Sequence, residues 1–215
     1  MSELFSIQLQ NRQQQGGDGV WLDLPTTTEQ VQVALRQIGI SSDNPQGLFI
    51  SGYFAEEEKR FAISYNMVLA SNVDELNFLA SRLETLSTGE RAELNAALQA
   101  PQSELFSIGR ITDFPENVDY YVHLPDVHGP AQLGDYYLNR SGMVNMPEEW
   151  KGGIDTAQFG RYVAQQEQGV FTQYGYLVKS GDEWQKVHEG QPVPEEYRVL
   201  SFPAPEVLRD SANIP

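Results

Sequence analysis

Two helix-start patterns fix the local fold of the middle of the chain. Asn72 is followed three residues later by Glu75, and Ser87 is followed three residues later by Glu90. This is the spacing of a capping box, in which two side chains satisfy backbone N–H groups at a helix N-terminus. Leucine and alanine recur at helical spacing as far as Pro101, which cannot continue a helix. The pattern predicts two short helices, whose apolar stripes need other parts of the chain or a second subunit to cover them.

The residues before these helices alternate like strands. Polar and apolar side chains alternate from Leu4 to Leu9, and a Gln/Gly-rich turn leads into VWLDLP (20–25). Thr26 with Glu29 predicts the start of a helix that ends at Gly39. Its apolar stripe would be Val31, Ala34, Leu35 and Ile38. Two further strands are predicted over 47–54 and 60–65.

The last part of the chain begins with a short repeat. SELFSI occurs at 2–7 and again at 103–108, and VWLDLP is echoed by YYVHLP (120–125). The repeat predicts a second β-β-α unit of similar plan. A helix is expected from Asp155 to about Glu167, and strands are expected over 169–178, 183–188 and 197–202. Pro203, Pro205 and Pro215 suggest a loose tail.

The order of these patterns predicts an α+β protein made of three small domains. An N-terminal α+β domain would cover 1–65, a helical middle domain 66–102, and a C-terminal α+β domain 103–202, with a tail over 203–215. The β-β-α-type units would therefore flank the helical domain. With 40% apolar residues, the 215-residue chain has enough material for a real core.

The charge balance excludes several kinds of partner. Asp and Glu number 30 against 14 Lys and Arg, which gives a net charge of −16. Such a chain repels nucleic acid and anionic lipid, because neutralising phosphates requires basic residues, and it attracts basic surfaces. One interpretation is that the acidity only keeps the protein soluble. The other is that the carboxylates are the working part and imitate something anionic.

The acidic excess is strongest from Ala62 to Trp150. This stretch has thirteen acids, four arginines and no lysine, for a net charge of −9. Its acids occur singly or in pairs along the predicted elements, which can hold carboxylates at fixed separations on a surface. Together with Asp155, the candidate surface acids are Asp74, Glu75, Glu84, Glu90, Glu93, Glu104, Asp113, Glu116, Asp119, Asp126, Asp135, Glu148 and Glu149.

Patterns for catalysis, metal binding and export do not stand out. The chain has no Cys, no Gly-x-Ser-x-Gly sequence and no Walker loop. His123 and His128 share neither a helix face nor a strand face, so we interpret them as solvated loop histidines. No signal-like N-terminus or long apolar window is present. We therefore expect a cytoplasmic protein without a metal site or a membrane span.

Five motifs, in order, resemble the ArdA family of antirestriction proteins over roughly residues 3–180. They are VWLDLP (20–25), ELNFLASRLETL (75–86), QLGDYYL (132–138), GGIDTAQFGRYV (152–163) and GVFTQYGYLV (169–178). The resemblance implies an elongated homodimer of three-domain chains from a mobile element. It also implies a DNA mimic that inhibits type I restriction–modification enzymes, with carboxylates in the groove where duplex DNA would lie. Because such an inhibitor makes and breaks no bond, the resemblance further implies that the chain is not an enzyme and needs no metal or cofactor.

Two alternatives remain open at the level of the sequence. The chain could be an acidic interaction module that blocks another DNA-binding protein. More remotely, it could be a hydrolase that uses a carboxylate pair, because thirty acids always supply candidate pairs and nothing in the sequence selects one. A collective charged surface predicts that no single acid is essential, whereas a hydrolase predicts one or two essential acids.

Overall fold

The N-terminal part folds as a sheet covered by one helix. The computed structural model describes residues 3–14, 17–41, 45–101 and 103–200. Strands β1 (Phe5–Asn11), β2 (Val20–Leu24) and β3 (Leu48–Phe54) form an antiparallel sheet in the order β2-β1-β3, and α1 (Thr28–Gln37) packs on its apolar face. The predicted stripe of α1 is buried. These strands and this helix confirm the sequence-based expectation.

The start of α1 lies one residue later than expected. Thr27, not Thr26, caps the helix, and its capping-box partner is Gln30, not Glu29. Thr26 is buried, and its N–H donates to Oδ1 of Asn77 at 2.7 Å. The backbone of Thr26 is thus used for a contact with the middle of the chain, which leaves the next threonine to cap the helix.

The expected strand over 60–65 is wrong. Residues 60–64 are extended without a strand partner, and α2 (Tyr65–Leu69) begins at the end of the segment. The N–H of Ala62 donates to Oδ1 of Asn95 at 2.7 Å, and Nδ2 of Asn95 donates to the carbonyl of Arg60 at 3.3 Å. A buried amide side chain therefore supplies the backbone hydrogen bonds that a neighbouring strand would have supplied.

The two central helices form as predicted. They are α3 (Val73–Glu84) and α4 (Thr88–Gln99), and both capping boxes are complete, with Asn72 and Glu75 in the first and Ser87 and Glu90 in the second. Leu76, Leu79, Ala80, Leu83 and Leu86 are buried. These side chains belong to one continuous apolar cluster that also includes Ile7, Leu35, Leu177 and Val199.

The second copy of SELFSI is not a strand, so the predicted repeat is wrong there. Ser103 Oγ accepts a hydrogen bond from Leu105 N at 3.1 Å, which forms a turn. Ser107 then caps α5 (Ile108–Thr112) by accepting from Arg110 N at 3.3 Å. In the first copy, Phe5 and Ser6 instead pair with β2. One hexapeptide thus adopts two conformations, because only the first copy has a neighbouring strand.

The C-terminal part contains the second sheet. Strands β4 (Tyr121–Leu124), β5 (Val170–Thr172) and β6 (Gly175–Lys179) form an antiparallel sheet in the order β4-β6-β5. The chain between β4 and β5 forms α6 (Pro130–Asp135), a π-helical turn at Tyr136–Arg140, α7 (Glu148–Lys151) and α8 (Thr156–Glu167). The helix predicted from Asp155 is confirmed. The strand predicted over 169–178 forms instead as two strands, β5 and β6, joined by a turn at Gln173 and Tyr174.

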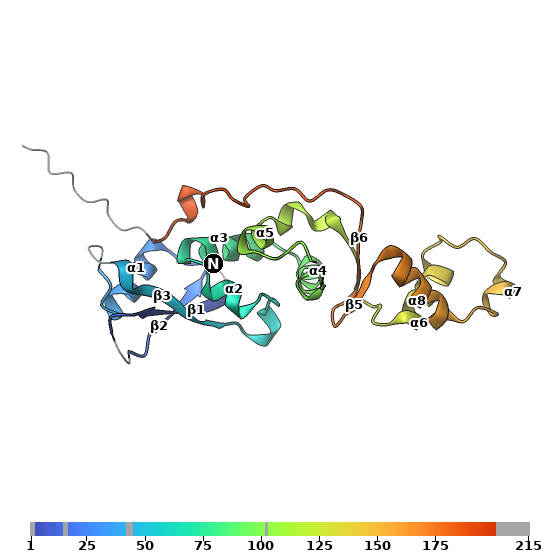
Figure 1. The fold of residues 1–215 in the computed structure, drawn as a ribbon, viewed down its shortest axis with the longest axis horizontal. Coiled ribbons are helices and arrows are strands. Elements are labelled where there is room, and N and C mark those ends of the chain that lie inside the picture. The colour runs from blue at the N-terminus through green and yellow to red at the C-terminus, as the bar shows by residue number, and fades with distance from the viewer. Residues whose placement is uncertain (1–2, 15–16, 42–44, 102, 201–215) are drawn as a thin grey trace, which may run out of the picture.

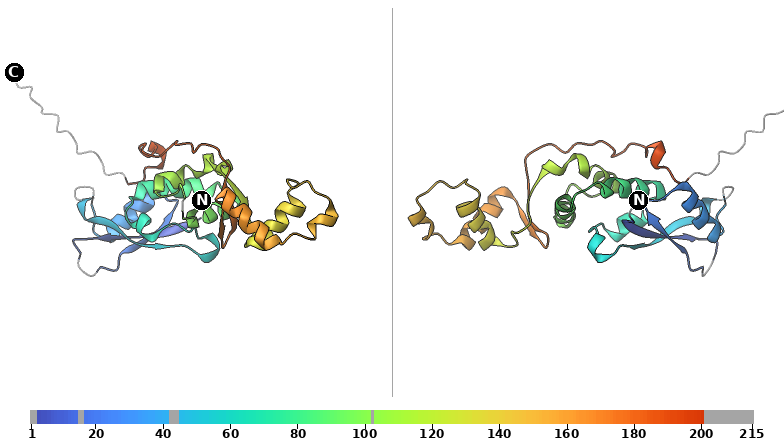
Figure 2. Two further views of the ribbon diagram at one scale, coloured as in Figure 1. Left: turned by 45° about the vertical axis from the view of Figure 1, so that its right-hand side comes forward. Right: turned by 180° about the vertical axis from the view of Figure 1, so that it is seen from behind.

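The elements follow one another along the long axis of Figure 1. The first sheet lies at one end, α6, α7 and α8 lie at the other, and α3, α4 and α5 lie between them. Both views of Figure 2 show the same separation. The large apolar cluster extends across the expected boundaries at 65 and 102, and a smaller one joins Val127, Leu133, Ala164 and Tyr176. Short 3₁₀ turns occur at Pro45–Gly47, Glu57–Lys59, Phe114–Glu116, Val118–Tyr120 and Glu195–Tyr197.

Residues 181–200, which we call the strap, run back from β6 over α5 and α3 toward the first sheet (Figure 1). The strand expected at 183–188 is absent, as is strand structure over 197–200; 201–202 and the tail at 203–215 lie outside the described residues. Side chains below the strap bind its backbone. Asp113 accepts from the N–H groups of His188 (2.6 Å) and Glu189 (3.3 Å), and Asn117 bonds both N–H and C=O of Gln185.

Closer to the first sheet, α3 holds the end of the strap. Oδ1 of Asp74 accepts from the N–H groups of Val199 (2.8 Å) and Leu200 (2.7 Å), and Nδ2 of Asn77 donates to the carbonyl of Tyr197 at 3.0 Å. The ring of Phe78 packs on Tyr197, with 4.7 Å between the ring centroids. The strap is therefore an extended segment whose partners are side chains of helices and turns.

The contact between α6 and α8 depends on two glycines. A Cβ at Gly160 would overlap the carbonyl oxygen of Pro130, and one at Gly134 would overlap that of Thr156. We expect Gly160→Ala to lower the free energy of unfolding by about 2 kcal/mol, because backbone must move to admit the methyl group. Urea unfolding followed by circular dichroism measures this change. Gly89→Ala in α4, where no atom lies within 4 Å of the new Cβ, should be neutral or stabilising.

Asp113 is the central anchor of the strap. Asp113→Ala removes both acceptors and leaves the N–H groups of His188 and Glu189 unsatisfied, so we expect a loss of about 1–3 kcal/mol. Hydrogen exchange should become faster over 185–190. Asp126→Ala, in an exposed loop, is the matched control and should leave the exchange of the strap unchanged. Equal exchange in both variants would show that Asp113 does not anchor the strap.

Candidate functional site

The fourteen candidate surface acids occupy three different environments. Glu116, Asp119, Asp126, Glu148, Glu149 and Asp155 are exposed; Asp74, Glu75, Glu84, Glu90, Glu93, Glu104 and Asp135 are partly buried; and Asp113 is fully buried. The exposed ones lie between the 3₁₀ turns before β4 and the start of α8. The candidate acids closest to the helical middle of the chain are the ones that folding covers.

Three candidate acids cap helices. Glu75 and Glu90 complete capping boxes, and Asp155 accepts from Gln158 N at 3.0 Å at the start of α8. Hydrogen bonds from the Ser87 hydroxyl and backbone lower the pKa of Glu90. A carboxylate in this position is both ionised and held in place, because the positive end of the helix dipole favours it.

Asp74 and Asp113 bind the backbone of the strap. Asp113 has 0% of its surface exposed, so it does not belong to any surface array. Asp74 is partly buried, and one of its oxygens accepts two backbone N–H groups. Nothing in the sequence distinguishes these two acids from the other candidates, but in the structure they anchor the strap to the helices below it.

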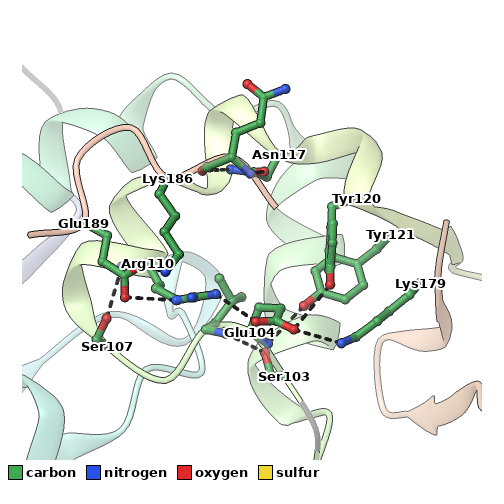
Figure 3. Close-up of polar contacts among 12 residues, drawn as sticks. Ser103, Glu104, Ser107, Arg110, Asn117, Tyr120, Tyr121, Lys179, Lys186 and Glu189 are labelled. Carbon is green, nitrogen blue, oxygen red and sulfur yellow. Dashed lines mark hydrogen bonds and ion pairs between the residues drawn. The ribbon is translucent and has the colours of Figure 1, made fainter. Parts of the chain in front are cut away.

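Glu104 lies in a network of opposite charges (Figure 3). Its carboxylate contacts Lys179 Nζ at 2.9 Å and Arg110 Nη1 at 2.8 Å, and Arg110 Nε also contacts Glu189 at 3.0 Å. The hydrogen bond from Lys179 is the main cause that lowers the pKa of Glu104. Lys186 pairs with Glu189 at 3.5 Å. Three cations thus surround two carboxylates, and the cluster presents no net negative charge to a partner.

Glu93 on α4 differs from the other acids in its protonation. Burial, with further contributions from the nearby carboxylates of Glu90 and Asp119, raises the pKa of Glu93 to about 8. One of its oxygens, Oε1, is buried without a hydrogen-bond partner. Glu93 is therefore largely protonated at neutral pH and adds little negative charge to the surface.

Internal ion pairs also use most of the basic residues. Arg82 pairs with Glu116, Arg140 with Asp135 at 3.3 Å, and Lys151 with Glu148 at 2.6 Å. With Lys59, Arg110, Lys179 and Lys186, seven of the thirteen basic residues in the described ranges lie in ion pairs. About half of the cations in these ranges are therefore matched locally with a carboxylate of the chain itself.

Exposed acids also occur outside the stretch that the sequence singled out. Glu3, Asp18, Asp23, Glu29, Glu56 and Glu57 precede it, and Asp182, Glu183, Glu195 and Glu196 follow it on the strap. Sequence reasoning missed these acids because the net charge is most negative from Ala62 to Trp150, where no lysine occurs. Marking the polar positions of each predicted strand and turn would have found several of them.

The histidines are not brought into a metal site. Nε2 of His123 lies 2.7 Å from the carbonyl oxygen of Tyr174, and His128 is exposed. Among the described residues, no group of three or more His, Asp or Glu side chains is placed to hold a metal ion. In the same residues, no helix is both long enough and apolar enough to span a membrane.

The raised pKa of Glu93 makes stability depend on pH. Folding favours the protonated form, so this contribution is complete below the unfolded pKa near 4.5 and is lost as the pH rises through about 8. We expect Glu93→Gln to match the wild type near pH 4.5. It should be more stable near pH 9, by on the order of 1–2 kcal/mol after allowance for partial exposure. Urea unfolding at the two pH values measures the difference, and a constant difference would contradict the assignment.

Comparison with known proteins identifies the family of this chain. The family model described as antirestriction protein (ArdA) matches residues 17–178, which is most of the chain. The match begins after β1 and extends from β2 into β6, so it includes α1 to α8. A search of curated proteins finds no significant match. The strap lies beyond the matched residues. The chain belongs to the ArdA family of antirestriction proteins.

Proposed function

We propose that this protein inhibits type I restriction–modification enzymes by occupying their DNA-binding groove as a mimic of duplex DNA. Family membership implies an antirestriction function, in which the protein is an inhibitor and not an enzyme. The observation that supports mimicry is the distribution of exposed carboxylates. They occur on the first sheet, in the turns before β4, on α7 and along the strap, all on folded elements.

Electrostatics explains how such a surface would compete with DNA. Duplex DNA carries about one negative charge per 1.7 Å of axis, and enzymes that bind it line their DNA-binding grooves with Lys and Arg. Carboxylates held at fixed positions would pair with these cations in place of phosphates. Salt screens charges at a surface, so inhibition should weaken as ionic strength rises. No bond is made or broken, and inhibition needs no metal or cofactor.

A mimic of duplex DNA must be an elongated molecule. The succession of elements along one long axis in Figure 1 supports this requirement. We propose that the chain is an elongated series of three parts, 1–65, 66–102 and 103–202, and that two chains form a homodimer in the cytoplasm. The first two parts and the second sheet share the large apolar cluster, so they would behave as one stiff body. Stiffness favours mimicry, because carboxylates already held in place lose little entropy on binding.

The main alternative partner is another DNA-binding protein with a basic surface. Phage plating separates the two: cells with a type I restriction system should restrict phage less when they express this protein. Unchanged restriction at good expression would remove restriction enzymes as the target. In that case, displacement of DNA from another basic protein would remain as the explanation of the acidic surface.

A distributed surface should tolerate single changes. We expect Glu84→Gln to reduce affinity for a purified type I enzyme by less than about fivefold, because one surface charge contributes up to about 1 kcal/mol. Displacement of a labelled DNA duplex measures the affinity. Complete loss of inhibition in this variant would contradict a collective mechanism.

Combined neutralisation should have a larger effect. We expect the triple variant Asp119→Asn, Asp126→Asn and Glu149→Gln to lose about 1.5 kcal/mol, roughly tenfold in affinity. The matched control exchanges the acids among themselves, as Asp119→Glu, Asp126→Glu and Glu149→Asp, and keeps the charge. The control should bind like the wild type; if both triple variants lose affinity equally, side-chain shape and not charge determines binding.

A further inference from the structure

Strand β2 has an open outer edge. It is the last strand of the first sheet, whose order is β2-β1-β3, and within the described ranges no strand pairs with its other side. An edge strand presents N–H and C=O groups that can accept a further strand.

A groove runs between this edge and α1. It has a volume of about 350 Å³ and is lined by Val20–Asp23 of β2 and by Glu29, Val33 and Gln37 of α1. A sheet edge beside a helix is the geometry in which some domains bind an extended peptide by adding it to the sheet as a strand. The peptide backbone bonds to the edge, and its alternate side chains face the helix and the opposite side of the sheet.

The two sides of the edge have different chemistry. On the helix side, Val33 keeps 47% of its surface exposed, so an apolar side chain of a bound segment could cover it. On the opposite side, Trp21 is 50% exposed and shares its face with the exposed Asp23, because the intervening Leu22 is buried. The Trp21 ring packs edge-on against Phe54, which is also exposed.

The charges around the groove are of one sign. Asp23 and Glu29 line it, and none of its lining residues is basic. Hydrogen bonds from its own backbone N–H and from Thr27 lower the pKa of Glu29, so this carboxylate is ionised at neutral pH.

Oδ1 of Asp23 accepts from Ser6 Oγ at 2.6 Å, which leaves the second oxygen for a partner. The Trp21 ring extends across the sheet toward Gly52 and Phe54. A long basic side chain added beside β2 would have the carboxylate and the exposed indole on the same face of the sheet, and both favour a cation.

We propose that this groove binds an extended segment of a partner protein by strand addition to β2. Basic side chains on one face of the segment would contact Trp21 and Asp23, and apolar side chains on its other face would contact Val33. The recognised sequence would therefore alternate Lys or Arg with apolar residues. This proposal does not depend on the DNA-mimic function, although Asp23 and Glu29 also belong to the exposed acids of the first part of the chain.

Selection from a phage-displayed library of random decapeptides on the full-length protein tests the proposal. We expect enrichment of sequences that alternate basic and apolar residues. A synthetic peptide of the enriched sequence should slow hydrogen exchange over Val20–Leu24, and N-methylation of alternate backbone amides should weaken its binding about tenfold or more, because strand addition needs these donors.

Val33→Arg adds a cation to the groove and should also weaken binding about tenfold. The matched control, Val187→Arg on the strap, replaces a valine that is 43% exposed and should bind the peptide normally. The proposal is overturned if enrichment is the same on wild type and Val33→Arg, or if N-methylation has no effect. It is also overturned if exchange over β2 slows with protein concentration without peptide, which would assign the edge to a second copy of the chain.

Discussion

Buried Asn and Asp side chains that bind the backbone of extended segments hold this fold together. Asn95 forms hydrogen bonds with the segment before α2, and Asn77 links α3 to both Thr26 and the strap. Asp113 and Asn117 bind the middle of the strap. A buried backbone group without a partner is costly, so each such segment must find one. Helical side chains meet this need here, and the chain can remain extended over long stretches without building a larger sheet.

Local patterns predicted the elements whose partners are near in sequence. The capping boxes of α3 and α4 and the stripe of α1 depend on neighbouring residues, and they form as expected. The failures share one cause. Segments 60–65, 183–188 and the second SELFSI have strand-like side chains, but their backbones meet side chains or turns instead of a strand. Such partners are fixed by tertiary packing, which a pattern of apolar residues does not reveal.

The acidic surface shows the same limit. The sequence located an excess of carboxylates, and the family resemblance supplied a use for them, but neither separates acids that hold the fold from acids that face solvent. Asp113 and Asp74 bind the strap, Glu104 is matched by cations, and Glu93 carries a proton. Net charge therefore overstates the charge that a partner meets at neutral pH in the middle of the molecule.

The strap lies outside the residues matched by the family model, yet four of the side chains that bind it lie inside them. In a relative without such an extension, an aspartate at the position of Asp113 would be left beside solvent or an apolar surface with no N–H group to accept. The extension and its anchors should therefore be inherited together. Positions 74, 77, 113 and 117 would then record, in any relative, whether its ancestors carried a strap.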